Sequence, residues 1–452
     1  MNPTILVSLS FFTCCLFLSG LAQAQRTCDE LIAAELDRLL ALYKGFHAAP
    51  ELSFHEERSA ALVAGELRSL GFTVFERVGR YDSKDPTCFG VVGVLENGAG
   101  PTVLVRADMD ALPVTEMTGL PYASGVTVTG EEGTETGLMH ACGHDMHMTC
   151  FIGTARILVA LKEAWRGTLI MVAQPAEETG AGAKAMLRDG LYDRFGRPDY
   201  GLALHVDAAL AAGTVGCSAG YAMASVDTVD VTVRGVGGHG AYPHTTKDPV
   251  VMAAQFVLNL QTIVSREVSP LDTAVVTVGS IHGGTKHNII PDAVHLQLTV
   301  RAYRDAVRQQ VLSSLRRIAE GIARGAGVPE DRFPTVVVSK ARAVPALYND
   351  PDLTGRLHKA WRQALGAGNV MEHLPVMAGE DFAHYSLAGH EIPTCLFWLG
   401  AVDPAKVEAS RRDGKPLPSL HSPFFAPTPK PTIRTGIDAM ASAVLELLAA
   451  GA

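Results

Sequence analysis

The chain has 452 residues, of which 47% are hydrophobic, and it carries a formal net charge of -9 at pH 7. This length is sufficient for two or three domains with large cores. The acidic balance and the absence of a basic run argue against nucleic acid as a partner, and the eight cysteines are too few for a disulfide scaffold.

The first 24 residues predict a signal peptide. A mostly apolar run from Ile5 to Leu21 precedes Ala22-Gln23-Ala24, which fits the small-x-small cleavage rule. No Lys or Arg precedes the run, so an uncleaved membrane anchor is the alternative, although the run is short for a spanning helix. We expect an exported protein, periplasmic or secreted, without stable membrane insertion after processing.

Export would expose the cysteines of the mature chain to an oxidising compartment. Cys28 and Cys88 lie near the N-terminus, outside the motifs discussed below, and could form a disulfide there. The alternative is two unrelated thiols, because pairing cannot be read from a sequence.

Helices and short apolar strands alternate from the leader to about residue 205. Apolar residues recur every three or four positions between Glu30 and Leu70, which predicts helices there. The other expected elements of this part are strands at 72–75, 91–95, 102–106, 168–173 and 200–204, and helices at 151–162 and 181–189. Strands that alternate with helices predict a largely parallel sheet covered on both faces.

The pattern changes near Gly220 to a second kind of unit. The expected elements are a strand at 228–234, a helix at 248–268, strands at 273–281 and 293–300, a helix at 306–326 and a strand at 335–339. The order β-α-β-β-α-β is that of a ferredoxin-like unit. Because α/β character returns with elements at 351–365, 394–400 and 432–448, we predict a catalytic domain in two parts, 25–219 and 338–452, with a lid or dimerisation domain at 220–337 inserted between them.

The densest group of chemically active residues runs from Leu138 to His147. It holds Cys142 and His144, two residues apart with a glycine between them, and Glu177-Glu178 follows about thirty residues later, after an apolar strand. A thiolate, an imidazole and a carboxylate together suit a borderline-soft divalent ion such as zinc. The alternative is one or two satisfied histidines beside an inert buried cysteine.

Further polar residues end other predicted strands or lie in loops. Asp108 and Asp110 follow a strand, where a carboxylate can either orient a ligating imidazole or form a solvated turn. His205 ends a buried strand, and His421 lies in a loop. Of the carboxylate pair, one side chain can bind metal while its neighbour holds a proton.

Six motifs in order across nearly the whole mature chain resemble those of the M20 metallopeptidase family. The similarity is to its amidohydrolase branch, which includes aminoacylases and the hippurate and auxin-conjugate hydrolases. The motifs are MHACGHDMH at 139–147, QPAEE at 174–178, GGHGAYPH at 237–244, NIIPD at 288–292, AGEDF at 378–382 and HSP at 421–423. The resemblance implies a zinc-peptidase-like α/β catalytic domain with an inserted ferredoxin-like α+β lid.

The resemblance also implies a site that binds two divalent metal ions. Zinc is expected, with manganese, cobalt or nickel as alternatives. Glu177 would be the general base on a water that bridges the metals. The implied ligands are Cys142, His144, Glu178, His205 and His421, with Cys142 bridging the two ions.

Other positions match residues of the family outside the metal ligands. His239 corresponds to a lid histidine that steadies the oxyanion in a neighbouring subunit's site, which implies a homodimer or higher homo-oligomer. Asn288 and Arg301 match positions that contact the substrate's carbonyl or carboxylate. Asp108 stands where the wider family has a ligating histidine, and Asp110 is expected to support the ligands from behind.

The sequence therefore predicts an exported, metal-dependent amidohydrolase that cleaves N-acyl amino acids. A dipeptidase or carboxypeptidase-like activity on short peptides is the nearest alternative. A non-catalytic binding protein of the same fold and a thiol-redox protein using Cys142 are two further alternatives; the second is disfavoured because Cys142 has no C-x-x-C partner.

Overall fold

A computed structural model describes residues 28–82, 87–129, 133–341, 343–387 and 389–449. The expected signal peptide lies outside these residues. Among the helices that the structure describes, none is both long and apolar enough to cross a bilayer. The chain divides into two units, of which the first comprises 1–220, 349–374 and 385–452, and the second comprises 221–348 and 375–384.

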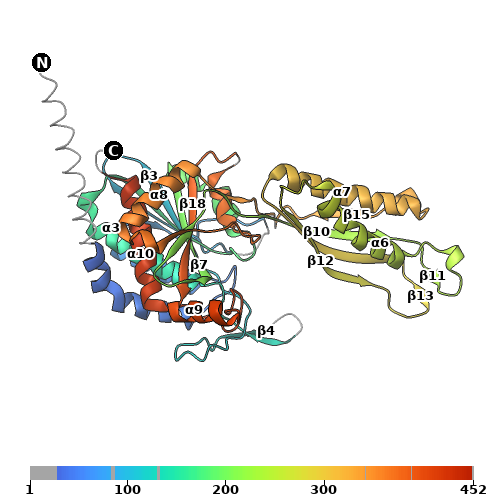
Figure 1. Ribbon diagram of the computed structural model, residues 1–452, viewed down its shortest axis with the longest axis horizontal. Coiled ribbons are helices and arrows are strands. Elements are labelled where there is room, and N and C mark those ends of the chain that lie inside the picture. Colours follow the sequence, from blue (N-terminus) through green and yellow to red (C-terminus); the bar gives the residue numbers. More distant parts are fainter. Residues whose placement is uncertain (1–27, 83–86, 130–132, 342, 388, 450–452) are drawn as a thin grey trace, which may run out of the picture. The chain divides into compact units, whose positions relative to one another are not determined.

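The first unit is built on an eight-stranded mixed sheet (Figure 1). Its four central strands, β6, β3, β7 and β18, run parallel, and β18 is buried along its whole length. Near-continuous apolar strands of this kind are typical of a sheet covered on both faces. In spatial order the strands are β1 (Thr73–Phe75), β2 (Val91–Asn97), β6 (Gly167–Gln174), β3 (Thr102–Asp108), β7 (Tyr200–Ala211), β18 (Thr394–Val402), β8 (Val215–Cys217) and β17 (Val370–Glu372).

Helices pack on this sheet and complete its core. Figure 1 shows α3, α8 and α10 near one another, and α10 contacts both of the others as well as β18. Of the other helices, α2 contacts β2, α4 contacts β6 and α9 contacts β7. The helices of this unit are a helix over 28–47, α2 (Glu57–Ser69), α3 (His144–Ala160), α4 (Gly182–Arg188), α5 (Leu191–Phe195), α8 (Pro351–Ala364), α9 (Pro404–Asp413) and α10 (Pro429–Leu447).

The sequence prediction placed the start of one helix too late. The helix expected at 151–162 is α3, which begins at His144, so His144 and His147 of the metal motif lie in its first turn. Apolar periodicity could not reveal this turn, because its polar residues His144, Asp145 and His147 are all buried and have polar partners elsewhere in the fold.

The second unit is an antiparallel sheet with two helices. Its strand order is β12-β14-β10-β15, and residues of β10 alternate between buried and half-buried or exposed, as expected for a sheet covered on one face. The elements are β10 (Ser225–Arg234), α6 (Pro249–Thr262), β12 (Ala274–Gly283), β14 (Ala293–Ala302), α7 (Asp305–Gly325) and β15 (Thr335–Val338), with a short pair β11 (Gly238–His239) and β13 (Ile289–Ile290) beside them. The predicted β-α-β-β-α-β order is confirmed.

The structure does not support a bridge between Cys28 and Cys88, which are both buried free thiols. Cys88 donates to the carbonyl of Val78 at 3.3 Å, whereas Cys28 begins the first helix near Asp438. Of the two alternatives, the structure therefore has two unrelated thiols, which pack against different parts of the chain.

Candidate metal centre

The candidate site lies where parallel strands of the first unit end. Asp108 is the last residue of β3 and is in register with Gln174, the last residue of β6. Glu177 and Glu178 follow β6, and His205 lies in β7 just beyond the stretch that pairs with β3. Since the carboxyl ends of parallel strands meet at one edge of a sheet, the fold brings these side chains together.

Cys142 and His144 enter this site from the start of α3. Gly143 between them adopts φ 82°, in the left-handed region that glycine tolerates best. A Cβ at this position would lie 2.5 Å from Cγ2 of Val206, so the backbone also approaches β7 closely. The glycine thus lets a thiol and an imidazole two residues apart project into one place.

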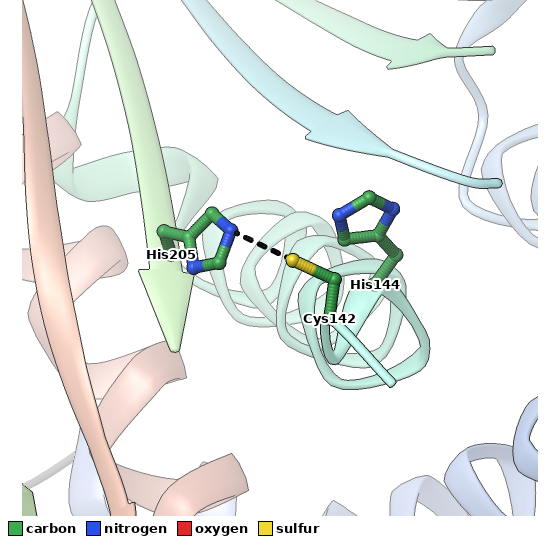
Figure 2. A group of neighbouring side chains, drawn as sticks. All are labelled: Cys142, His144 and His205. Carbon is green, nitrogen blue, oxygen red and sulfur yellow. Dashed lines mark hydrogen bonds between the residues drawn. The ribbon is translucent and has the colours of Figure 1, made fainter. Parts of the chain in front are cut away.

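The predicted ligand atoms converge on the thiol of Cys142. Figure 2 shows His205 and His144 on either side of it, and the Sγ lies 3.5 Å from Nε2 of His205 and 3.3 Å from Nε2 of His421. Oε1 of Glu178 is 3.5 Å from Nε2 of His421 and 3.9 Å from Nε2 of His144. Ligand atoms within 4.8 Å of one another form the groups Cys142-His144-His205, Cys142-Glu178-His421 and His144-Glu177-Glu178.

Hydrogen bonds on the far side of two imidazoles turn their Nε2 atoms toward the site. Nδ1 of His144 donates to the carbonyl of Asp110 at 2.7 Å, and Nδ1 of His205 lies 2.8 Å from the carbonyl of Val206. Such contacts fix the ring orientation of metal-binding histidines. Nε2 of His144 and Oε1 of Glu178 are buried and have no hydrogen-bond partner among the described residues, so this donor set fits a bound cation.

The electrostatics of the site also favour a bound cation. Burial raises the pKa of Glu178 to about 7 and holds the pKa of the Cys142 thiol well above its usual range. A divalent cation reverses this effect, because its charge stabilises the thiolate and the carboxylate together. The cluster is therefore electrostatically suited to metal ions.

Asp110 holds the backbone of the carboxylate pair, as expected for a residue behind the ligands. Its buried carboxylate accepts the backbone N–H groups of Glu177 and Glu178 at 3.2 and 3.0 Å and the hydroxyl of Ser53 at 2.6 Å. Sequence reasoning missed a second support: Oε1 of the fully buried Glu56 accepts the N–H of Ala176, at 2.8 Å, where the turn begins.

Asp108 and His147 form another possible ligand group with His144, but their atoms have other partners. Nε2 of His147 accepts the N–H of Val206 at 2.9 Å, so its Nδ1–H donates to Oδ1 of Asp108 at 2.6 Å. Oδ2 of Asp108 accepts from Arg106 at 2.7 Å. Burial lowers the pKa of His147 to about 4, which agrees with a neutral ring that supports the strand carrying His205.

His421 reaches the site from a loop. Its backbone has φ 65°, its N–H donates to the carbonyl of Ala141 at 2.9 Å, and its side chain is 54% exposed. The bond to Ala141 ties this loop to the residue before Cys142. The least buried of the predicted ligands is thus held by its backbone.

The remaining predicted residues belong to the second unit, whereas the five predicted ligands and Glu177 belong to the first. His239 on β11 is exposed, and its Nδ1 accepts the N–H of Ala241 at 3.0 Å. Asn288 immediately precedes β13, the partner of β11, so it lies near His239. Arg301 on β14 is half-buried and donates to the carbonyl of Met377 at 2.6 Å, in the segment 375–384.

Comparison with known proteins agrees with this site. The model of peptidase family M20/M25/M40 matches residues 104–444. An N-acetyl-L-cysteine deacetylase of Bacillus subtilis is 37% identical over 351 residues, covering 77% of each chain. The IAA-amino acid hydrolase ILR1-like 5 of Arabidopsis thaliana is 34% identical over 391 residues, covering 86% of this chain and 82% of the plant protein.

A solved structure of an M20 family protein has the same fold. The Bacillus subtilis YXEP protein, a dinuclear metal binding peptidase from the M20 family, superposes with a TM-score of 0.72 at 28% identity, over 92% of this chain and 99% of that one. These matches argue against the two non-hydrolytic alternatives, a binding protein and a thiol-redox protein. The resemblance inferred from the motifs is confirmed: the chain belongs to peptidase family M20/M25/M40 and is a metal-dependent hydrolase.

Proposed function

We propose that this protein hydrolyses the amide bond of N-acyl amino acids at a site that holds two divalent metal ions. The observation that carries the proposal is that Cys142 belongs to two groups of ligand atoms, one with His144 and His205 and one with Glu178 and His421. A thiolate shared by two groups of ligands is placed to bridge two neighbouring ions. The names of the bacterial and plant relatives supply the substrate class, since each denotes an amide between an acyl group and an amino acid.

Zinc is the proposed metal, because a thiolate, three imidazoles and a carboxylate form a borderline-soft donor set; manganese, cobalt and nickel are alternatives. When bound, such ions polarise an amide carbonyl and lower the pKa of water. The chain's own contribution is to hold the ligands at fixed positions through Asp110, Val206 and the backbone of the His421 loop.

Glu177 is the proposed general base. Its side chain lies within 4.8 Å of the ligand atoms of His144 and Glu178, and its backbone is fixed by Asp110. From this position its carboxylate would take a proton from the attacking water and pass it to the leaving amine. Donors from His239 and Asn288 would face the carbonyl oxygen as it gains charge, and Arg301 would bind the substrate carboxylate.

Two further parts of the proposal concern where and in what form the enzyme works. The apolar run and Ala22-Gln23-Ala24 support export to the periplasm or the medium. His239 lies in a different unit from the metal ligands, and we propose that it serves the site of a second subunit in a homodimer.

The test replaces Glu177 by Gln, which keeps the shape of the side chain but cannot accept the proton. N-Acyl amino acids and unblocked dipeptides are assayed with each candidate metal, and metal content is measured in parallel. The variant is expected to keep its metals and lose more than 99% of its activity, since general base catalysis contributes about 10²–10⁴-fold.

The matched control is Glu163→Gln, because the side chain of Glu163 is 99% exposed and its loss should change nothing. Activity above a few per cent of wild type in Glu177→Gln would remove Glu177 as the base. Faster cleavage of dipeptides than of N-acyl amino acids would overturn the substrate class and favour the peptidase alternative.

A further inference from the structure

A buried histidine outside the ligand set lies between two carboxylates behind the metal centre. His47, the last residue of the helix over 28–47, is 1% exposed. Its Nδ1 lies 2.7 Å from Oδ2 of Asp145, and its Nε2 lies 3.0 Å from Oε1 of Glu116. Tyr43 and Tyr122 pack against the ring, with centroids 5.7 and 5.3 Å away.

The contacts of the two carboxylates favour a cationic ring. Oδ1 of Asp145 accepts the N–H of Met146 at 2.8 Å, and Oε2 of Glu116 accepts the N–H of Ser124 at 2.7 Å, and hydrogen bonds of this kind stabilise the ionised form of each carboxylate. With both carboxylates ionised, both ring nitrogens of His47 donate. Burial by itself lowers the pKa of His47, but the hydrogen bonds to Asp145 and Glu116 outweigh it and raise that pKa to about 10.

One of these carboxylates is joined directly to a metal ligand. Asp145 follows His144 in the first turn of α3, and its side chain is as buried as that of His47. A fixed Asp145 side chain therefore limits how this turn can rotate. The orientation of His144 depends on that turn.

The other carboxylate is joined to a second ligand through a loop. Glu116 closes the loop over 116–124, because its two oxygens accept from Thr118 and Ser124 at the loop's start and end. The N–H of the next residue, Met117, donates to the carbonyl of Pro423 at 2.8 Å, two residues beyond His421. His421 thus sits on a loop that is held on one side by Ala141 and on the other by Met117.

We propose that His47 is a positioning residue that cross-links the turn carrying His144 to the loop supporting His421, and thereby sets the spacing of two ligands that belong to different groups around Cys142. The inference rests on the two-metal site of the proposed function. His47 is distant from most of the ligands in sequence and contacts none of them. Its effect passes through Asp145 and Glu116 alone.

The test is metal affinity measured without substrate. His47→Gln removes the charge and can donate to only one carboxylate at a time. The variant and the wild type are stripped with a chelator and titrated with zinc against a chromophoric competitor, and with cobalt(II), whose thiolate charge-transfer band reports Cys142. We expect at least one ion to bind about 10- to 100-fold more weakly, as is typical when a supporting partner of a ligand is lost.

The matched control is Tyr43→Phe. It alters the same packed group, but among the described residues the Tyr43 hydroxyl makes no hydrogen bond to His47, Asp145 or Glu116. Tyr43→Phe should keep wild-type affinities and an unchanged cobalt band. If it weakened metal binding as much as His47→Gln, general packing rather than the cross-link would be responsible, and the proposal would be overturned.

Glu116→Gln keeps the test decisive if His47→Gln does not fold. This substitution keeps an acceptor for Ser124 but weakens the bond to His47, and it should lower affinity in the same direction. Wild-type affinity for both ions in whichever variants fold would refute the proposal. A wild-type chain that binds two ions but cleaves no N-acyl amino acid would refute the proposed substrate and leave this test of His47 intact.

Discussion

Replacing Gly143 by Ala tests whether the close approach of the motif to β7 shapes the metal centre. A residue with a Cβ at φ 82° costs about 1–2 kcal/mol in the left-handed region. The new Cβ would also lie 2.5 Å from Cγ2 of Val206, a buried β-branched side chain with little rotational freedom. Overpacking of this kind costs about 1–3 kcal/mol, so we expect a total loss of about 2–5 kcal/mol.

A control at Gly71 separates the two contributions. Gly71 has φ 87°, and a Cβ there meets nothing within 4 Å, so Gly71→Ala measures the backbone cost alone. The difference between the two variants is then the clash with Val206. Adding Val206→Ala to Gly143→Ala should recover part of that difference, which a double-mutant cycle measures.

The assay is urea unfolding followed by tryptophan fluorescence. Trp165, Trp361 and Trp398 all lie in the first unit, so their emission reports that unit even if the second unfolds separately. Metal content of the folded variant is measured alongside, and Gly143→Ala should retain less metal than Gly71→Ala. Equal unfolding free energies within about 0.5 kcal/mol, with metal retained in both, would refute the argument that Val206 confines this turn.

Three further predictions concern ligands, subunits and pH. Cys142→Ser should lower metal content and activity, because an alcohol is a poor bridging ligand at neutral pH; two tightly bound ions per variant chain by metal analysis would contradict the bridging role. Mixing inactive Glu177→Gln and His239→Ala chains should restore partial activity through hybrid dimers, and no recovery after confirmed subunit exchange would instead favour a monomer. The pKa of His47 is about 10 in the folded chain, against an ordinary value of 6.5 in the unfolded chain. The protonated ring should therefore stabilise the fold by up to ~5 kcal/mol below pH 6.5, and this contribution should decline as pH rises toward 10. The stability gap between wild type and His47→Gln, measured by urea unfolding, should shrink over that range, and a gap that is constant with pH would mean that His47 is not a buried cation.

The sequence by itself determined the chemical identity of the candidate ligands and the order of strands and helices in the second unit. Thiol, imidazole and carboxylate groups keep their metal preference wherever they lie, and the resemblance of the motifs implied Cys142, Glu178 and His421 as candidate ligands before any contact was known. The β-α-β-β-α-β order of the second unit was predictable because alternating burial repeats along strands such as β10. Local patterns of this kind need no knowledge of distant parts of the chain.

Only the tertiary structure decided which polar residues support the ligands. From the sequence, a lone histidine such as His47 would be assigned to the core, because its partners Glu116 and Asp145 are 69 and 98 positions away. His147 stands in the same motif as His144, yet bonds to Asp108 and Val206 occupy both of its nitrogens. The placement of 375–384 in the second unit likewise depends on backbone hydrogen bonds with Ala222 and Ala224, just before β10. These assignments follow from hydrogen bonds between segments far apart in sequence, and the free energy of satisfying buried polar groups appears only once the fold brings those segments together.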